Sequence, residues 1–241
     1  MRRVTAAARS APVPPDSPLA DTVLERLTAV YAPAADPMRA EAAAAYMRHV
    51  APFLGIPAPR RRALSRTVRT GAGRPDERDC AAIALRCWRL PEREYHYFAV
   101  DFLRRHVGRC SSGFLPVLCH LVSTVPWWDT VDLLAAYVAG PLVAADPALG
   151  REMDRWIDDE NLWVARTALL HQLRYRESTD AERLFGYCLR RAGHPDFFVR
   201  KAIGWALREY ARTDPAAVRD FVDGARDHLS PLSVREALKH L

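Results

Sequence analysis

The chain has 241 residues, 49% of them hydrophobic and 27% charged, a composition that supports a sizeable core and excludes wholesale disorder. The formal net charge is +6, and because Lys201 and Lys239 are the only lysines, 33 of the 35 cations are arginines. The longest nearly apolar run, residues 133–145, is interrupted by Gly140-Pro141 and is shorter than the roughly 18 to 20 residues of a membrane span, so we expect no membrane-spanning helix.

The N-terminal segment differs in composition from the rest of the chain. Residues 1–18 are rich in alanine, arginine and proline, so we expect a flexible tail there. From residue 19 to residue 241 the pattern is helical, with almost no strand signal. Apolar residues recur at helical spacing most clearly in residues 76–89, 162–175 and 198–211.

Prolines divide this helical region into short elements. Many of them suit the first turn of a helix, as in Asp214-Pro215 and Ser230-Pro231. Residues 70–75, with two glycines and a proline, read as a flexible turn. We expect about 12 or 13 short helices in a single domain over residues 19–241, because no long structureless loop divides it.

The five cysteines are odd in number and contain no Cys-x-x-Cys pair. This argues against a disulfide framework and a zinc knuckle, and favours a reducing cytoplasm. Cys80 and Cys87 lie in an apolar helical pattern, where we expect buried thiols that act as small hydrophobic groups.

An arginine motif repeats along the C-terminal half. The pattern Arg-x-Ala-Leu/Ile begins at Arg166, Arg200 and Arg235, with spacings of 34 and 35 residues, and a further step of 34 back from Arg166 reaches Asp132. A period of this length over helical hairpins indicates an α-solenoid of degenerate HEAT-like repeats. Because equivalent positions of stacked repeats line one face, we expect Asp132, Arg166 and Arg200 to form a row.

Familiar catalytic motifs are missing from the sequence. It contains no Gly-x-Ser-x-Gly elbow, no His-x-x-x-His pair, no Walker loop and no Gly-x-Gly-x-x-Gly. We therefore expect no bound metal and no organic cofactor.

The placement of tryptophan is more informative. Trp128 and Asp132 are four residues apart, and Lys201, Trp205 and Arg208 follow at i, i+4 and i+7, so each set shares a helix face. Such tryptophans can stack on a base or sugar, or attract a cation. The alternatives are that they fill the core and that Asp132 is a solvated acid paired with an arginine one repeat away. Asp129 reads as a first-turn acid stabilised by the helix dipole.

Several motifs, in the same order and at similar spacing, resemble the AlkD family of bacterial DNA alkylation-repair glycosylases from about residue 19 to the end. They are Tyr46-Met-Arg, Phe53-Leu-Gly-Ile-Pro57, Leu90-Pro-Glu-Arg-Glu94, Trp127-Trp-Asp-Thr-Val-Asp132, Asn161-Leu-Trp-Val-Ala-Arg166, the segment from Phe197 to Tyr210, and Leu232-Ser-Val-Arg-Glu-Ala-Leu-Lys239.

The resemblance implies an all-α superhelix of HEAT-like repeats with a basic concave face for duplex DNA. It implies monofunctional hydrolysis of the N-glycosidic bond of cationic alkylated purines, such as 7-methylguanine and 3-methyladenine, without base flipping. The matching catalytic positions are Trp128, Asp132 and Trp205; Arg166 matches a backbone-binding arginine, and Tyr46 a position that lines the lesion. Phosphate contacts are further expected from Arg200, Lys201 and Arg208.

Two alternatives remain open at the level of sequence. One is a relative specialised for bulky minor-groove adducts in antibiotic self-resistance, and the other is a non-catalytic HEAT-repeat scaffold that binds DNA or protein. For the leading hypothesis we expect a monomer that acts on double-stranded DNA in the bacterial cytoplasm.

Overall fold

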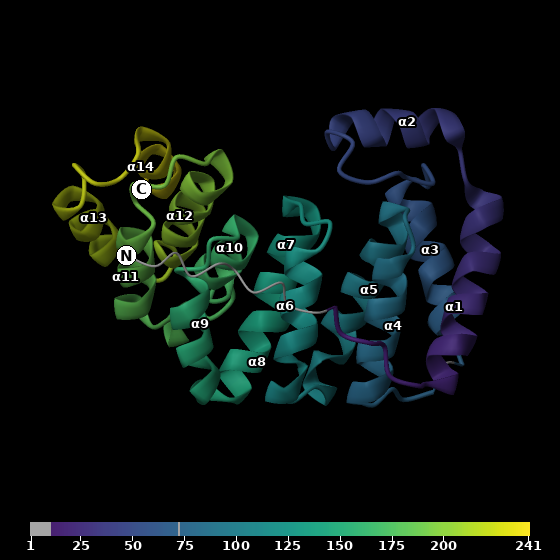
Figure 1. Cartoon of the computed structure of the whole chain (residues 1–241). Helices are drawn as coiled ribbons and strands as arrows, with labels where there is room; N and C mark the ends of the chain where they lie inside the picture. Colours follow the sequence, from purple (N-terminus) through teal and green to yellow (C-terminus); the bar gives the residue numbers. More distant parts are fainter. Residues whose placement is uncertain (1–10, 72) are drawn as a thin grey trace, which may run out of the picture. The chain divides into compact units, whose positions relative to one another are not determined.

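The computed structural model describes residues 11–71 and 73–241. All regular secondary structure in this part of the chain is helical, which confirms the prediction of an all-α fold built from helical repeats (Figure 1). The described residues divide into two compact units, 11–130 and Val131–Leu241. The single domain expected over residues 19–241 stays a prediction. Of the flexible tail expected over residues 1–18, residues 1–10 lie outside the described residues.

The unit of residues 11–130 is a set of short helices connected by tight turns. Within it α4 and α5 pack closely, and α1 packs against α3 and α4. Its helices are α1 (Pro18–Tyr31), α2 (Pro37–Tyr46), α3 (Ala58–Arg69), α4 (Glu77–Arg89), α5 (Arg93–His106), α6 (Leu115–Ser123) and the first turn of α7 (Trp128–Leu134).

The unit Val131–Leu241 continues the same architecture. Here α12 packs extensively on α14 and also contacts α10. The unit contains the rest of α7, a π-helical turn (Ala135–Ala139), α8 (Gly140–Ala145), α9 (Gly150–Trp156), α10 (Leu162–Leu170), α11 (Ala181–Arg190), α12 (Phe197–Tyr210), α13 (Pro215–Gly224) and α14 (Pro231–Ala237).

Local sequence signals fix most helix starts. The side chains of Asp214 and Ser230 cap α13 and α14, and the proline after each takes the first helical position, as predicted. Asp76 closes a capping box with Asp79 at the start of α4. The helix predicted over residues 162–175 ends earlier, at Leu170, and residues 171–174 form turns.

Side-chain hydrogen bonds between helices reproduce the repeat length. Five of them join partners that lie 34 to 36 residues apart in sequence, which is the spacing expected when one repeat stacks on the next. The pairs are Tyr31–Ser65, Arg93–Asp129, Asp132–Arg166, Gly140–Tyr175 and Ile157–Arg191.

The break expected at Gly140-Pro141 does not end the helix. The Gly140 N–H donates to the carbonyl of Ala135, five residues earlier, and this wider π turn leads directly into Pro141, which has no N–H to donate. A Cβ on Gly140 would lie 2.3 Å from the carbonyl oxygen of His171, so glycine permits the close approach of the chain after α10. If α7 and α8 are taken as one helix continued through this turn, the described residues form 13 α-helices, in agreement with the expected 12 or 13.

Two smaller predictions also concern this fold. Cys80 and Cys87 are fully buried, and Gly71 and Gly73 adopt positive φ in the predicted turn. Among the described residues, no single helix is long and apolar enough to span a membrane; one pair bent by 119°, Trp128–Ala145 with Pro147–Trp156, meets the length and composition criteria together.

Candidate functional site

Helix α7 carries two of the predicted catalytic residues. Trp128 is its first residue and is 37% exposed, and Asp132 follows one turn later on the same face. Asp132 is 9% exposed, so its carboxylate lies at the edge of the protein interior. The boundary between the two compact units falls between these residues, inside α7.

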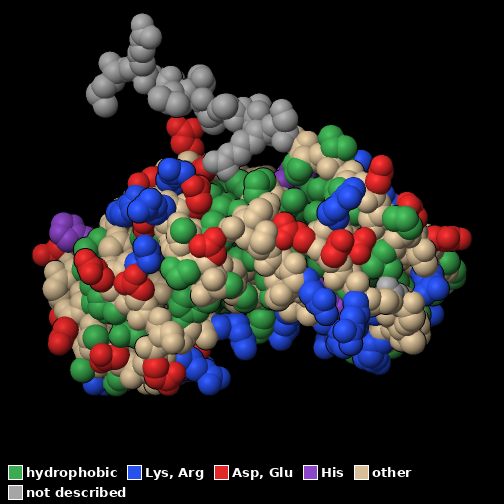
Figure 2. All heavy atoms as spheres, turned by 90° about the horizontal axis from the view of Figure 1, so that it is seen from below, with side chains coloured by type: hydrophobic (Ala, Val, Ile, Leu, Met, Phe, Trp, Pro, Cys, Tyr) green, Lys and Arg blue, Asp and Glu red, His purple; other side chains and the backbone are tan. Residues whose placement is uncertain are grey.

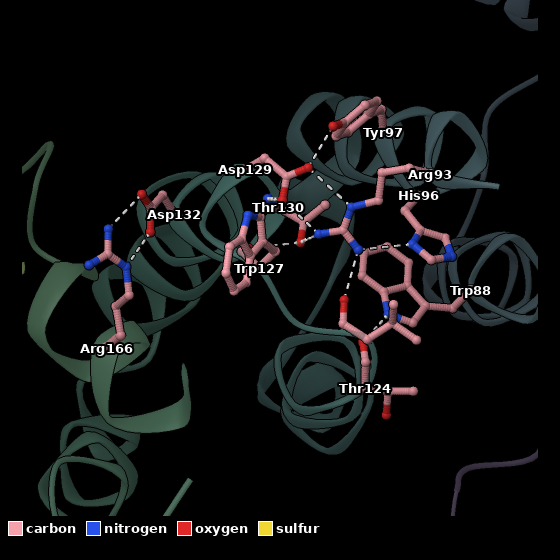
Figure 3. A network of polar contacts seen from close by, with 11 residues as sticks. Trp88, Arg93, His96, Tyr97, Thr124, Trp127, Asp129, Thr130, Asp132 and Arg166 are labelled. Carbon is pink, nitrogen blue, oxygen red and sulfur yellow. Dashed lines mark hydrogen bonds and ion pairs between the residues drawn. The ribbon is translucent and has the colours of Figure 1, made fainter. Parts of the chain in front are cut away.

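Asp132 pairs with Arg166, which α10 contributes. The Nε and Nη2 atoms of Arg166 donate to Oδ1 and Oδ2 of Asp132 at 2.7 and 2.8 Å, a two-pronged ion pair (Figure 3). The repeat spacing predicts this pairing as the alternative role of Asp132, but the pair is buried rather than solvated. Because the pair is buried, removing either partner would cost far more folding free energy than removing one partner of a surface ion pair, since the remaining charge would be left uncompensated in the interior.

The environment of Arg166 differs from that of a typical phosphate-binding side chain. Arg166 is only 3% exposed, and its Nη1 donates to the carbonyl of Phe198, at the start of α12. Three of its N–H donors are therefore used within the protein. In this structure Arg166 orients Asp132, and its expected contact with DNA phosphate stays a prediction.

Helix α12 places Lys201, Trp205 and Arg208 on one face, as the spacing predicts. Lys201 Nζ and Arg208 Nη1 lie 2.7 and 2.6 Å from the two carboxylate oxygens of Glu236 on α14. Trp205, on the same helix, is half-buried. These contacts, with Lys201 the larger contributor, hold the pKa of Glu236 below its usual value. Glu236 is not predicted as a site residue from the sequence, although it follows Arg235 in the third copy of the arginine motif.

The remaining predicted contacts lie apart from these pairs. Arg200 is half-buried and its Nε donates to the carbonyl of His194 at 2.9 Å, so the expected row of Asp132, Arg166 and Arg200 is joined by an ion pair only at its first step. Tyr46 is the last residue of α2, in the unit of residues 11–130, and is 77% exposed.

A second buried ion pair, not predicted from the sequence, holds the beginning of α7. Arg93, fully buried at the start of α5, donates through Nε and Nη2 to Asp129 at 3.1 and 2.6 Å. It also donates to Thr130 Oγ1 at 2.9 Å and to the carbonyl of Val125 at 2.7 Å (Figure 3). The Tyr97 hydroxyl donates to Asp129 at 2.6 Å. Asp129 is thus more than the first-turn acid expected from its position.

This network constrains the loop before Trp128. Val125 has a φ of +46°, an unfavourable conformation for a β-branched residue, and the bond from Arg93 to its carbonyl holds it there. His96 lies beside Arg93, and burial, reinforced by the charge of Arg93, lowers its pKa to about 4. The signal that could have revealed the pair is the 36-residue separation of Arg93 and Asp129, close to the repeat length.

Comparison with known proteins shows which family the chain belongs to. A sequence model of the family described as "DNA alkylation repair enzyme" matches residues 27–241, which include every candidate residue above. Among solved structures, the chain is similar to one described as a predicted DNA alkylation repair enzyme from Enterococcus faecalis, with 33% sequence identity and a TM-score of 0.79 over 86% of this chain and 96% of that one. No curated protein matches the chain. The chain belongs to the family of DNA alkylation repair enzymes.

Proposed function

We propose that the protein is a monofunctional DNA glycosylase that hydrolyses the N-glycosidic bond of cationic alkylated purines in duplex DNA, in the first step of base excision repair. The observation that carries this proposal is the buried Asp132–Arg166 pair, one helical turn after the exposed Trp128. Membership of the DNA alkylation repair family supplies DNA as the partner. The activity belongs with bacterial DNA, in the cytoplasm.

Alkylation determines where catalysis is needed. A purine alkylated at N7 or N3 is already a cation, so it leaves with the electrons of the bond to C1′ and becomes neutral without prior protonation. The deoxyribose is left as an oxocarbenium ion, water adds at C1′, and the water loses a proton. The developing sugar cation is therefore the charge that the protein must stabilise.

Asp132 has the chemistry for this task. Arg166 donates one hydrogen bond to each of its oxygens, so the carboxylate is held as an anion in a fixed orientation beside Trp128. A carboxylate about 4 Å from a cation contributes on the order of 4 kcal/mol at an effective dielectric constant of about 20. Removing that charge should cost roughly 100- to 1,000-fold in rate.

The two tryptophans would contact the damaged nucleotide from outside the base stack of the DNA duplex. Trp128 presents 37% of its surface to solvent, and its face can stack on the sugar or attract the cationic base. An exposed ring of this kind suits a lesion that stays at the protein surface, and this supports cleavage without base flipping. Trp205 would act in the same way from α12, where Lys201 and Arg208 would contact phosphates on exchanging their ion pairs with Glu236.

The test is release of 7-methylguanine from methylated duplex DNA by the wild type and by Asp132→Asn. We expect base release by the wild type and a 100- to 1,000-fold lower rate for the variant, on the order given for loss of one electrostatic contact. Asp220→Asn, which removes an exposed acid on α13, is the matched control and should be fully active. Circular dichroism checks that each variant is folded.

The outcomes separate the alternatives. A wild type that binds DNA but releases no methylated purine and no bulky minor-groove adduct would be a scaffold rather than an enzyme. Release of bulky adducts alone would indicate the self-resistance specialist. Full activity of Asp132→Asn would remove Asp132 from catalysis. For binding, Arg166→Ala should flatten the dependence of log affinity on log salt by about one unit, and an unchanged slope would remove Arg166 from the phosphate contacts. Because this variant leaves Asp132 without its buried partner, the slope is measured at a temperature where circular dichroism shows the variant to be folded.

A further inference from the structure

Glu94, next to Arg93 in the first turn of α5, is a buried acid with no part in the site described above. It is 2% exposed, whereas acids usually lie at the surface, as the Asp and Glu side chains visible in Figure 2 do. A buried carboxylate is costly unless hydrogen bonds compensate its charge. The groups that compensate Glu94 therefore show what this acid holds in place.

Glu94 binds the loop that leads from α2 to α3, residues 54–56. Its Oε2 accepts a hydrogen bond from the N–H of Leu54 at 2.8 Å, and its Oε1 accepts from Gly55 and Ile56 at 2.8 and 3.2 Å. Such bonds to an ionised acceptor are about twice as strong as neutral ones. The helix dipole also favours an acid in the first turn, but it does not require bonds to a loop 38 to 40 residues earlier.

The loop of residues 54–56 is joined in turn to the beginning of α2. The N–H of Asp36, the N-cap of α2, donates to the carbonyl of Leu54 at 2.8 Å. A Cβ on Gly55 would lie 2.2 Å from the Asp36 carbonyl oxygen and 2.5 Å from the Ala40 nitrogen, so the loop backbone touches the first turn of the helix. Gly55 also has a φ of +80°, which favours glycine. Glu94 thus acts on α2 through one short loop.

Helix α2 has few other attachments. Ala44 is its only buried residue, and none of the extensive helix–helix contacts of the described residues involves α2. The buried Met47, directly after the helix, attaches its other end. Figure 1 shows α2 running crosswise to α1 and α3 rather than alongside them. With 10 residues it is shorter than the roughly 12 to 15 residues below which an isolated helix is marginal, so its order depends on these attachments.

The position of α2 determines the position of Tyr46. This tyrosine is the last residue of α2 and is 77% exposed, so the helix that carries it sets where its ring lies. Arg93, the residue before Glu94, holds the loop before Trp128 through the Val125 carbonyl at 2.7 Å. Two consecutive charged residues of α5 therefore hold the two segments that carry the aromatic candidates of this unit.

We propose that Glu94 is a positioning residue: through the loop of residues 54–56 it places α2, and thereby Tyr46, against the damaged nucleotide. The proposal rests on the proposed function for the role of Tyr46 as a residue that lines the lesion. Glu94 is buried and acts without touching DNA. Together with Arg93 it makes the first turn of α5 a common support for Tyr46 and Trp128.

The first experiment measures hydrogen exchange of α2 by mass spectrometry in the wild type and in Glu94→Gln. The amide oxygen of glutamine can still accept from Gly55 and Ile56, but its NH₂ group would face the N–H of Leu54, donor against donor. The matched control is Glu25→Gln, which neutralises an exposed acid on α1 in the same unit.

We expect the amides of residues 37–46 and 54–56 to exchange roughly ten- to hundred-fold faster in Glu94→Gln, the factor that corresponds to one hydrogen bond to a charged group. Exchange in α4 should stay at the wild-type level, and Glu25→Gln should change neither region. Unchanged exchange of α2, or an equal increase in α4, would overturn the proposal.

A second variant tests the same connection while Glu94 is intact. Gly55→Ala places a Cβ against Asp36 and Ala40, so the loop must move away from α2 and exchange of α2 should again increase. Its matched control is Gly71→Ala, which has a similar φ of +75° but whose Cβ would meet no atom within 4 Å. This control carries the same backbone strain and should leave α2 unchanged. Equal exchange of α2 in the two glycine variants would count against the loop as the link.

Base release then separates the positioning of Tyr46 from a general loss of stability. Single-turnover rates are compared for the wild type, Glu94→Gln, Tyr46→Ala and the double variant, at a temperature where circular dichroism shows all four to be folded. If Glu94 acts through Tyr46, Glu94→Gln slows release in the wild-type background but causes no further loss in Tyr46→Ala. Losses that simply multiply would show that Glu94 does not act through Tyr46.

The exchange experiments do not require catalysis, so the two proposals can fail separately. If the wild type releases no base while Glu94→Gln and Gly55→Ala both loosen α2, the proposed glycosylase fails and Glu94 stands as the support of α2. If base release is normal and the exchange of α2 is unchanged in both variants, the glycosylase stands and the role of Glu94 fails.

Discussion

Removing the acid from the buried Arg93–Asp129 pair should strongly destabilise the protein. Arg93 is fully buried and the side chain of Asp129 is only 8% exposed, so Asp129→Ala leaves a guanidinium in the interior without a counter-charge. The hydrogen bonds from Arg93 to Thr130 Oγ1 and to the Val125 carbonyl remain, but these acceptors are neutral and do not balance its charge. Breaking a buried pair in this way costs about 3 to 5 kcal/mol, a large part of the roughly 5 to 15 kcal/mol that stabilises a typical protein.

Urea unfolding followed by circular dichroism measures this loss as a lower midpoint at an unchanged slope. The control is Asp223→Ala, which removes the partner of Arg226 from an exposed pair with side chains 69% and 57% accessible, and should change stability by less than about 0.5 kcal/mol. Replacing both Arg93 and Asp129 by leucine should recover much of the loss, since no buried charge remains. A loss below about 1 kcal/mol for Asp129→Ala would refute the reasoning, because it would mean that Arg93 is solvated or has another counter-charge.

Three further predictions concern other parts of the structure. His96 has a folded pKa of about 4 against about 6.5 when unfolded, so it binds its proton more weakly in the folded state. Its contribution to stability is therefore present above pH 6.5 and is lost as pH falls towards 4, by up to about 1.4 kcal/mol per pH unit. Below pH 6.5 the free energy of unfolding should fall more steeply with decreasing pH for the wild type than for His96→Asn, and equal pH dependence of the two would contradict this. Gly204→Ala places a Cβ 2.4 Å from the Cβ of Glu236, so α12 and α14 must separate at a cost of about 1 to 3 kcal/mol. In the control, Gly186→Ala on α11, the new Cβ meets no atom within 4 Å and should stabilise the protein by up to about 1 kcal/mol. Thermal melts compare the two variants, and equal changes in melting temperature would count against the close packing of α12 on α14. Glu236→Gln removes the acid shared by the two cations of α12, so affinity for undamaged DNA should rise in fluorescence anisotropy if those cations bind phosphate; unchanged affinity would argue that they do not.

Much of the helical framework follows from local chemistry and was predictable. Asp214-Pro215 and Ser230-Pro231 mark helix starts because a capping side chain and a proline act within one turn, whatever the tertiary structure. The 34-residue spacing of Asp132 and Arg166 predicted their register for a different reason: in stacked repeats, equivalent positions become neighbours.

The end of α10 and the turn at Gly140-Pro141 show where local signals were insufficient. The apolar pattern continues past Leu170, but the chain turns there and its His171 carbonyl approaches Gly140. Tyr175 then donates its hydroxyl proton to the Gly140 carbonyl at 2.7 Å. The π turn before Pro141 is therefore part of a contact between repeats, and no local rule identifies it.

By itself, the sequence determined the all-α repeat architecture, the motifs that identify the family, and the candidate residues on α7, α10 and α12. Only the tertiary structure decided which charges are buried. Asp132–Arg166 is an interior pair, Glu236 sits between Lys201 and Arg208, and Arg93 holds the loop before Trp128. The physical reason is that spacing sets which residues become neighbours, whereas the strength of a charge pair depends on the solvent that the surrounding helices exclude.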